Sequence, residues 1–242
     1  MSVARTMAVA RLVFREQTRD RLLWLAVALA VLLAAGIRGV EWINFCLPRA
    51  RFLLDGGLTA ISVGGLLLTV AAAIQSLHRQ LESGLAAMLL ARGVRRDELV
   101  IGHWLAMLGL LAAFAVLPGI VLMLALTGTA DTAVEAGRGL ALIWLRCAVV
   151  AAVALAVACL IRSLALALSL TLLLVAAGFL RDLAGPLFNA EGWLLSLTAL
   201  VPDLGAFDSS NQVGLGRLLP YALGHFALWL FIALVGYRRR EL

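Results

Sequence analysis

The residues of this sequence that could do chemistry gather between two long apolar runs, at positions 78–98. A polar segment, 78–84, follows the first run, and a charged segment, 92–98, precedes the second run, which begins at Leu99. Between these segments, apolar side chains recur at helical spacing and predict an amphipathic helix over 81–92. The side chains on its apolar face are Leu81, Leu85, Met88 and Leu89. Such a helix could anchor a loop beneath a bilayer, or it could form a docking surface for a partner protein.

Groups suited to catalysis or metal binding are sparse in the rest of the sequence. The twenty strongly basic residues are all arginine, so the chain has no lysine for a P-loop or for Schiff-base chemistry. Cys46, Cys147 and Cys159 lack CxxC spacing, and we expect them to be small buried hydrophobes. The three histidines are scattered and form no ligand cluster. We therefore expect no catalytic residue, no metal site and no cofactor in this chain.

The composition indicates a protein embedded in a membrane. Of the 242 residues, 63% are hydrophobic and 14% are charged, and the mean hydropathy is +1.02, whereas a soluble domain has about 25% charged residues. A helix that crosses a bilayer needs about 20 apolar residues. We therefore predict an all-α membrane protein that forms a single transmembrane domain over residues 1–242. Its six predicted transmembrane helices are 22–40, 53–77, 99–126, 140–161, 164–180 and 218–237.

Two further helices are predicted outside the spans. In residues 1–21, apolar and basic side chains both recur at helical spacing, which is typical of an amphipathic helix on a membrane surface. The apolar residues are Val3, Met7, Ala10 and Phe14, and the basic stripe is Arg11, Arg15 and Arg19. The apolar run 192–201 is too short to span a bilayer, so we predict a re-entrant or interfacial helix there, before the last span.

The distribution of arginine predicts the orientation in the membrane. With six spans, the N-terminal segment, 78–98, the turn at 162 and the C-terminal tail all lie on one side of the membrane. Thirteen of the twenty arginines lie in these segments. The positive-inside rule assigns that side, with both termini, to the cytoplasm. Arg146 lies inside the predicted span 140–161, sixteen residues and about 24 Å from Arg162. We expect its side chain to snorkel to the opposite membrane surface.

The segment from position 80 to 103 resembles the cytoplasmic loop of the membrane subunits of type 2 ABC exporters. That loop often reads E-I-x-x-[RK]-T, then L-L-S-x-P-x-x-R, and then G-K where the third span begins. The matching residues here are Leu89, Leu90, Arg96 and Gly102. The family's acidic residue, threonine, proline and lysine are replaced by Gln80, Leu85, Gly93 and His103. The start of the second span, the N-terminal helix and the basic C-terminus are also similar to that family, so the resemblance covers the whole chain.

The resemblance implies a permease subunit of an ATP-driven exporter in a bacterial-type plasma membrane. Two six-span subunits, identical or different, would pair in the lipid bilayer, and separate cytosolic ABC ATPase subunits would bind ATP and dock beneath them. No nucleic acid is implied as a partner. Closure of the ATPases would push on the helix over 81–92 and on the N-terminal helix, and so drive export. The residues implied in coupling to the ATPase are Glu82, Leu85, Met88, Leu89, Arg92, Arg96, Arg11 and Arg15.

Two other classes of function also fit parts of the sequence. A membrane assembly or scaffold protein could use the same cytoplasmic segment to hold a partner that is not an ATPase. An intramembrane enzyme would need paired ionisable groups deep in the spans. The last span offers only His225 and Trp229, which we expect to be hydrogen-bonded packing groups. The spans have no charged pathway, which disfavours small ions as cargo and leaves lipids, peptides, hydrophobic drugs and polymers open.

Overall fold

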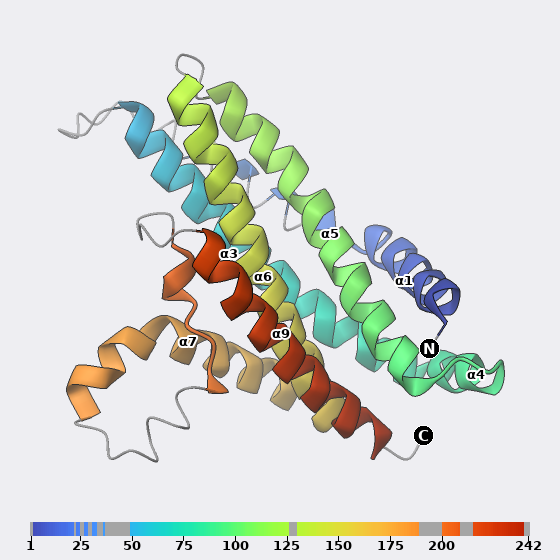
Figure 1. Ribbon diagram of the computed structural model, residues 1–242. Helices are drawn as coiled ribbons and strands as arrows, with labels where there is room; N and C mark the ends of the chain where they lie inside the picture. The colour runs from blue at the N-terminus through green and yellow to red at the C-terminus, as the bar shows by residue number, and fades with distance from the viewer. Residues whose placement is uncertain are drawn as a thin grey trace.

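The chain is helical throughout the parts that the structure describes. The computed structural model describes residues 2–21, 23–24, 27–28, 31–32, 36, 49–125, 130–188, 200–208 and 215–239, and these contain no strand. In chain order the helices are α1 (Val3–Thr18), α3 (Arg49–Glu82), α4 (Leu85–Ala91), α5 (Arg96–Ala125), α6 (Ala130–Leu160), α7 (Leu164–Phe188), the short 3-10 helix η1 (Gly205–Phe207) and α9 (Leu215–Arg238) (Figure 1). The prediction of an all-α fold is confirmed.

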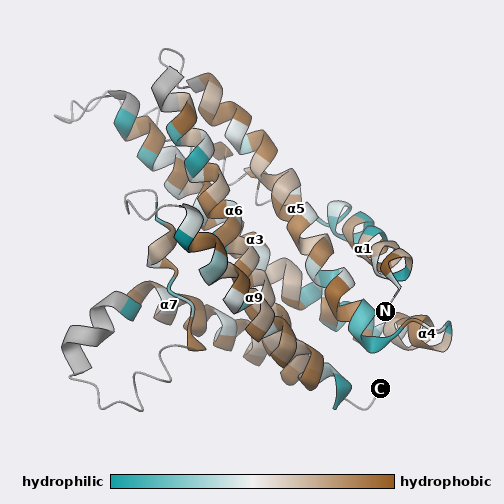
Figure 2. Cartoon of the chain, viewed as in Figure 1, coloured by the Kyte–Doolittle hydropathy of each residue, from teal (hydrophilic) through white to brown (hydrophobic). Residues whose placement is uncertain are grey.

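Five of the described helices are long and apolar enough to cross a membrane, namely α3, α5, α6, α7 and α9. They coincide with the second to the sixth predicted spans. Most of the first predicted span, 22–40, and all but the last two residues of the predicted re-entrant or interfacial helix, 192–201, lie outside the described residues. Figure 2 shows the long apolar stretches of these helices, with hydrophilic residues on α1 and near the ends of the bundle. This is the architecture of a multi-pass membrane protein.

Three helices extend beyond the spans predicted from hydropathy, because they continue into polar sequence. α3 runs through the polar residues 78–82 and ends at Glu82. α6 begins at Ala130, ten residues before the predicted start of its span, and α7 continues past 180 to Phe188. Hydropathy locates the end of the apolar residues, whereas a helix ends where its backbone hydrogen bonds end. Polar side chains readily continue an α-helix, so the two limits differ.

α6 lies at the centre of the bundle. Every residue from 147 to 159 is buried, and the run consists only of alanine, valine, leucine and cysteine. Small side chains allow membrane helices to approach each other closely, and α6 packs against α3, α5, α7 and α9. Cys147 and Cys159 are buried within this run, as predicted. The central helix therefore fixes the positions of the other four long helices.

The two ends of the bundle differ in what they carry. α4, the start of α1, the start of α5 and the end of α9 lie together at one end, which we call the elbow end (Figure 1). The starts of α3 and α6 lie at the opposite end, so these two helices run parallel to each other and antiparallel to α5. The first and last described residues of the chain are therefore on the same side as α4.

α1 packs along the first half of α5. Its buried face consists of Thr6, Val9, Ala10, Val13 and Gln17. Of the residues predicted on the apolar face, Ala10 is buried and Phe14 is partly buried against the core, whereas Val3 and Met7 are exposed. The buried face includes the polar side chains of Thr6 and Gln17, which a purely apolar pattern excludes. The basic stripe of Arg11, Arg15 and Arg19 is exposed.

Candidate functional site

The elbow, residues 83–95, consists of α4 and the turn on each side of it. Gly84, two residues after the end of α3, has a left-handed backbone with φ 71°. Gly93, two residues after the end of α4, is left-handed as well, with φ 82°. This conformation costs residues with a Cβ about 1–2 kcal/mol, which is why glycine stands at both positions. After α4, the N–H groups of Gly93 and Val94 donate to the carbonyls of Leu90 and Leu89, as in a Schellman motif.

These two glycines make α4 a separate helix of seven residues. The predicted continuous helix over 81–92 is wrong, since Leu81 belongs to α3 and the other three apolar residues belong to α4. Apolar residues continue at helical spacing across Gly84, but the helical backbone conformation is interrupted there. The elbow is therefore a short helix held between two sharp turns.

α4 presents one large apolar side chain outward. Met88 is 59% exposed, whereas Leu85 and Leu89 are half-buried and Leu89 packs against the main core. Glu82, at the end of α3, and Arg92, just after α4, are both exposed. The elbow thus offers an exposed methionine with an acidic residue before it and a basic residue after it. An adaptable apolar side chain between charges is suited to contact with a partner protein.

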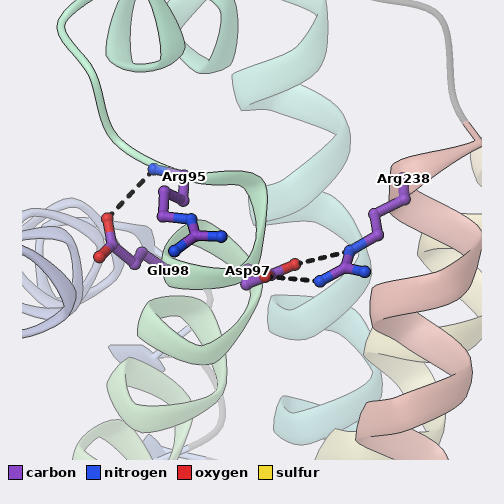
Figure 3. A network of polar contacts seen from close by, with 4 residues as sticks. All are labelled: Arg95, Asp97, Glu98 and Arg238. Carbon is purple, nitrogen blue, oxygen red and sulfur yellow. Dashed lines mark hydrogen bonds and ion pairs between the residues drawn. The ribbon is translucent and has the colours of Figure 1, made fainter. Parts of the chain in front are cut away.

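Glu98 joins the start of α5 to the start of α1. Its side chain is 1% exposed. One carboxylate oxygen accepts a hydrogen bond from the Arg95 backbone N–H at 3.1 Å, which caps the start of α5 (Figure 3). The other oxygen accepts a hydrogen bond from the Ser2 backbone N–H at 2.6 Å. This carboxylate therefore fixes the elbow and α1 to the same point.

Asp97 joins the start of α5 to the end of α9. Arg238 donates from Nε and Nη2 to the two Asp97 oxygens, at 3.0 and 2.7 Å (Figure 3). Such a two-bond arrangement between guanidinium and carboxylate fixes orientation as well as distance. Arg96 donates from Nη1 to the Arg238 carbonyl at 2.8 Å. Arg96 was predicted to couple to an ATPase, and in the structure it contacts α9.

α1 reaches the elbow through a residue that the sequence analysis did not select. Arg5 donates from Nη1 to the Gly93 carbonyl at 2.7 Å. Arg11 and Arg15, which were predicted to couple, lie about two and three helical turns further along α1. They are exposed, and the structure does not bring them to α4 in any contact between described residues. The basic stripe was visible in the sequence, but the residue of α1 that contacts the elbow was not.

The end of α3 is held by three further contacts at the elbow end. Arg79 forms an ion pair of 3.0 Å with Asp20, just after α1. Gln80 donates from Nε2 to the Glu16 carboxylate of α1 at 2.9 Å. His78 Nε2 lies 3.2 Å from the Arg162 carbonyl, in the turn between α6 and α7. The elbow contacts α1 directly, and the helices before and after it contact α1, α9 and the α6–α7 turn.

The four departures from the ABC exporter motif have definite places in this structure. Gln80 is buried and binds Glu16, and Leu85 begins α4. Gly93 has a φ of 82°, which proline cannot adopt because its ring fixes φ near −65°. His103 is fully buried, and its Nδ1 lies 3.0 Å from the Leu99 carbonyl of the same helix.

Two predictions about polar groups within the spans are wrong. Arg146 does not snorkel, because its side chain is buried and donates to Ser62 of α3. His225 Nδ1 and Trp229 Nε1 are buried without a hydrogen-bond partner among the described residues, although both rings are packed. The space available beside Arg146 could not be inferred from the sequence.

Charge complementarity was the available signal for the missed pair of Asp97 and Arg238, whereas Arg5 and Glu98 bind backbone groups, which have no signal of this kind. The acidic first turn of α5 and the basic last turn of α9 are visible in the sequence, but they do not specify which residues pair. Among the described residues there is no group of three His, Cys, Asp or Glu side chains that could hold a metal ion. No protein-family model matches this chain, and no curated protein matches it.

Proposed function

We propose that this chain is the membrane-spanning subunit of an ATP-driven exporter whose ATPase is a separate cytosolic protein. The observation that carries the proposal is the elbow, which presents Met88 outward while it is bonded to α1 and the helix that follows it is bonded to α9. A partner pressing on α4 would act through short polar contacts on α1, α5 and α9. This arrangement is suited to converting movement of a docked protein into movement of helices.

The proposed orientation in the membrane is inferred from the arginine content of the elbow end. The arginine-rich segments of the sequence and the elbow share one end of the bundle, and we assign that end to the cytoplasm. ATP is available there to a docked ATPase. The membrane is a plasma membrane of the bacterial type, as the resemblance of the loop to ABC exporter subunits implies.

A second membrane subunit, identical or different, completes the proposed exporter. α7 supports this part of the proposal, because large apolar side chains are exposed along it. They include Leu166, Leu172, Leu173 and Leu180. Such a helix must be covered by lipid or by another membrane helix.

The proposal is tested by looking beside the gene for this chain for an ATPase gene with the P-loop pattern G-x-x-x-x-G-K-[ST], and then by co-purification with that ATPase. The full chain, the Met88→Glu variant and the Arg92→Glu variant are each co-expressed with that ATPase, and ATP turnover of the purified complex is measured. We expect Met88→Glu to lower both ATPase recovery and turnover by at least about tenfold, because a central interface residue commonly contributes more than about 1.4 kcal/mol.

Val134→Glu is the matched control. Val134 is 73% exposed, lies at the opposite end of the bundle on α6, and precedes Glu135, so a carboxylate is already tolerated there. We expect this variant to keep wild-type recovery and turnover. If no ATPase is recovered with the wild-type chain, the exporter proposal is wrong and a scaffold that holds another partner becomes the better account. If Met88→Glu behaves like Val134→Glu, the elbow is not the docking site.

A further inference from the structure

A large hollow lies in the half of the bundle opposite the elbow. Its volume is about 870 Å³, and it is lined by the first half of α3, the first half of α6, Phe179 of α7, and Phe207 and Asp208. Binding pockets for small molecules usually have volumes of about 300–1,000 Å³. The hollow is separate from the elbow contacts, and none of the proposed coupling residues lines it.

One buried cation lines this hollow. Arg146 is 7% exposed, and its Nη1 donates to Ser62 Oγ at 3.0 Å. Its Nε has no hydrogen-bond partner among the described residues, and its guanidinium carbon lies 5.4 Å from the centre of the Phe179 ring. A guanidinium carries five N–H donors in a planar fork that matches carboxylate and phosphate groups. Burial of a charge with so few partners is unfavourable unless another group pairs with it.

The carboxylate of Asp208 is the alternative partner for this cation within the described chain. Asp208 lines the same hollow and interacts with Arg146 electrostatically. However, Asp208 is exposed, and Arg146 forms no ion pair within 4.0 Å with any described residue. The structure therefore leaves room for a second anionic group beside the Arg146 guanidinium.

The rest of the lining is divided into an apolar inner part and a charged outer part. Near Arg146 the buried lining side chains are apolar apart from Ser62, and they include Leu58, Ile143 and Phe207. The exposed charged residues of the lining are Arg51, Asp55, Glu135, Arg138 and Asp208, and all but Asp208 belong to the first three turns of α3 and α6. A ligand that fits this lining has an anionic group for Arg146 and an alkyl body for the apolar walls.

We propose that this hollow binds an amphiphile with an anionic phosphate or carboxylate group, and that Arg146 is the residue that binds this group. The binding site itself does not depend on the proposed exporter function. The identification of the amphiphile as the transported substrate does rest on that function.

The proposal is tested by calorimetric titration of the full chain in nanodiscs of zwitterionic lipid, with empty nanodiscs as the reference. The three probes are octyl phosphate, octanol and inorganic phosphate, which separate the amphiphile from its apolar body and from a free anion. We expect octyl phosphate to bind at least tenfold more tightly than either octanol or inorganic phosphate. Arg146→Gln should remove this difference. Arg51→Gln, which removes an exposed arginine of the same lining, should change octyl phosphate binding by less than threefold.

Several results would overturn the proposal. Equal binding of octanol and octyl phosphate would mean that the hollow is only an apolar groove, and equal binding of inorganic phosphate would mean a small-anion site. Unchanged binding in Arg146→Gln, or a greater loss in Arg51→Gln, would show that Arg146 does not bind the anion. If Arg146→Gln does not fold, Arg146→Lys carries the test, with an expected loss of at least threefold because ammonium lacks the planar fork. These titrations contain no ATPase, so their failure is distinguishable from failure of the exporter proposal.

Discussion

Arg238 and Asp97 are 141 positions apart in the sequence, and two hydrogen bonds of 3.0 and 2.7 Å join their side chains (Figure 3). The pair connects the last turn of α9 to the first turn of α5. Because α5 begins directly after the elbow, this contact joins the end of α9 to the helix that follows α4. It also gives the proposed coupling route a contact that can be removed without disturbing α4 itself.

Arg238→Gln should loosen the last turn of α9 while changing global stability little. Arg238 is largely exposed, and exposed ion pairs contribute about 0–1 kcal/mol. We expect faster amide hydrogen exchange in the last turn of α9 and a loss of unfolding free energy below about 1 kcal/mol. Arg239→Gln is the control, since Arg239 is an exposed arginine at the next position. Equal exchange in both variants would mean that the pair does not hold α9.

Glu98→Ala should destabilise the protein and release the start of α1. The substitution leaves the partly buried N–H groups of Ser2 and Arg95 without their acceptor, and loss of a helix cap costs about 0.5–2 kcal/mol. Thermal unfolding in detergent and amide exchange of α1 measure the two effects. Glu82→Ala removes an exposed carboxylate at the end of α3 and should change stability by less than about 0.5 kcal/mol. If exchange in α1 does not rise in Glu98→Ala, this carboxylate does not anchor the helix.

Gly102→Ala should displace α1 from α5. A Cβ at this position would lie 2.7 Å from Val9 Cγ1 and 3.2 Å from the Thr6 carbonyl oxygen. Overpacking of this kind costs about 1–3 kcal/mol. Gly102 also matches the glycine of the ABC exporter motif. In this structure a glycine is needed there because α1 approaches α5 closely.

A double-mutant cycle with Val9→Ala tests this contact. We expect Val9→Ala to cost less in the Gly102→Ala background than alone, with a coupling of about 0.5–3 kcal/mol measured by unfolding in detergent. Gly224→Ala is the control, because nothing lies within 4 Å of a Cβ there. Additive effects of the two substitutions would contradict a direct contact between α1 and α5 at these positions.

The long helices could be predicted because their signal is local. Each span is a long, predominantly apolar run, and burial of α6 requires only the small residues that are visible in its sequence. The elbow was located for a similar reason, since polar segments on both sides of 85–90 interrupt the apolar runs. Its division at Gly84 was missed because helical periodicity was followed through a residue with left-handed φ.

The contacts at the elbow end and the environment of Arg146 could not be predicted. Both depend on residues brought together from distant parts of the chain, such as Asp97 with Arg238 and Arg146 with Ser62. Many arginines and carboxylates of this sequence are compatible as partners, and only the packing of the helices selects among them. The hollow beside Arg146 is likewise a consequence of how α3, α6 and α7 are arranged.

The central claim is that the elbow docks a cytosolic ATPase. Site-specific crosslinking tests it most directly. The native cysteines are replaced by serine, and one cysteine is introduced either by Met88→Cys at the exposed position of α4 or by Val134→Cys at the opposite end. Each variant is co-expressed with the ATPase encoded beside its gene and treated with a short crosslinker that joins thiols to amines.

We predict a crosslinked product of this chain and the ATPase for Met88→Cys that increases when ATP is bound, and none for Val134→Cys. Co-purification of an active complex that gives no product from Met88→Cys, or equal products from both positions, would contradict the account.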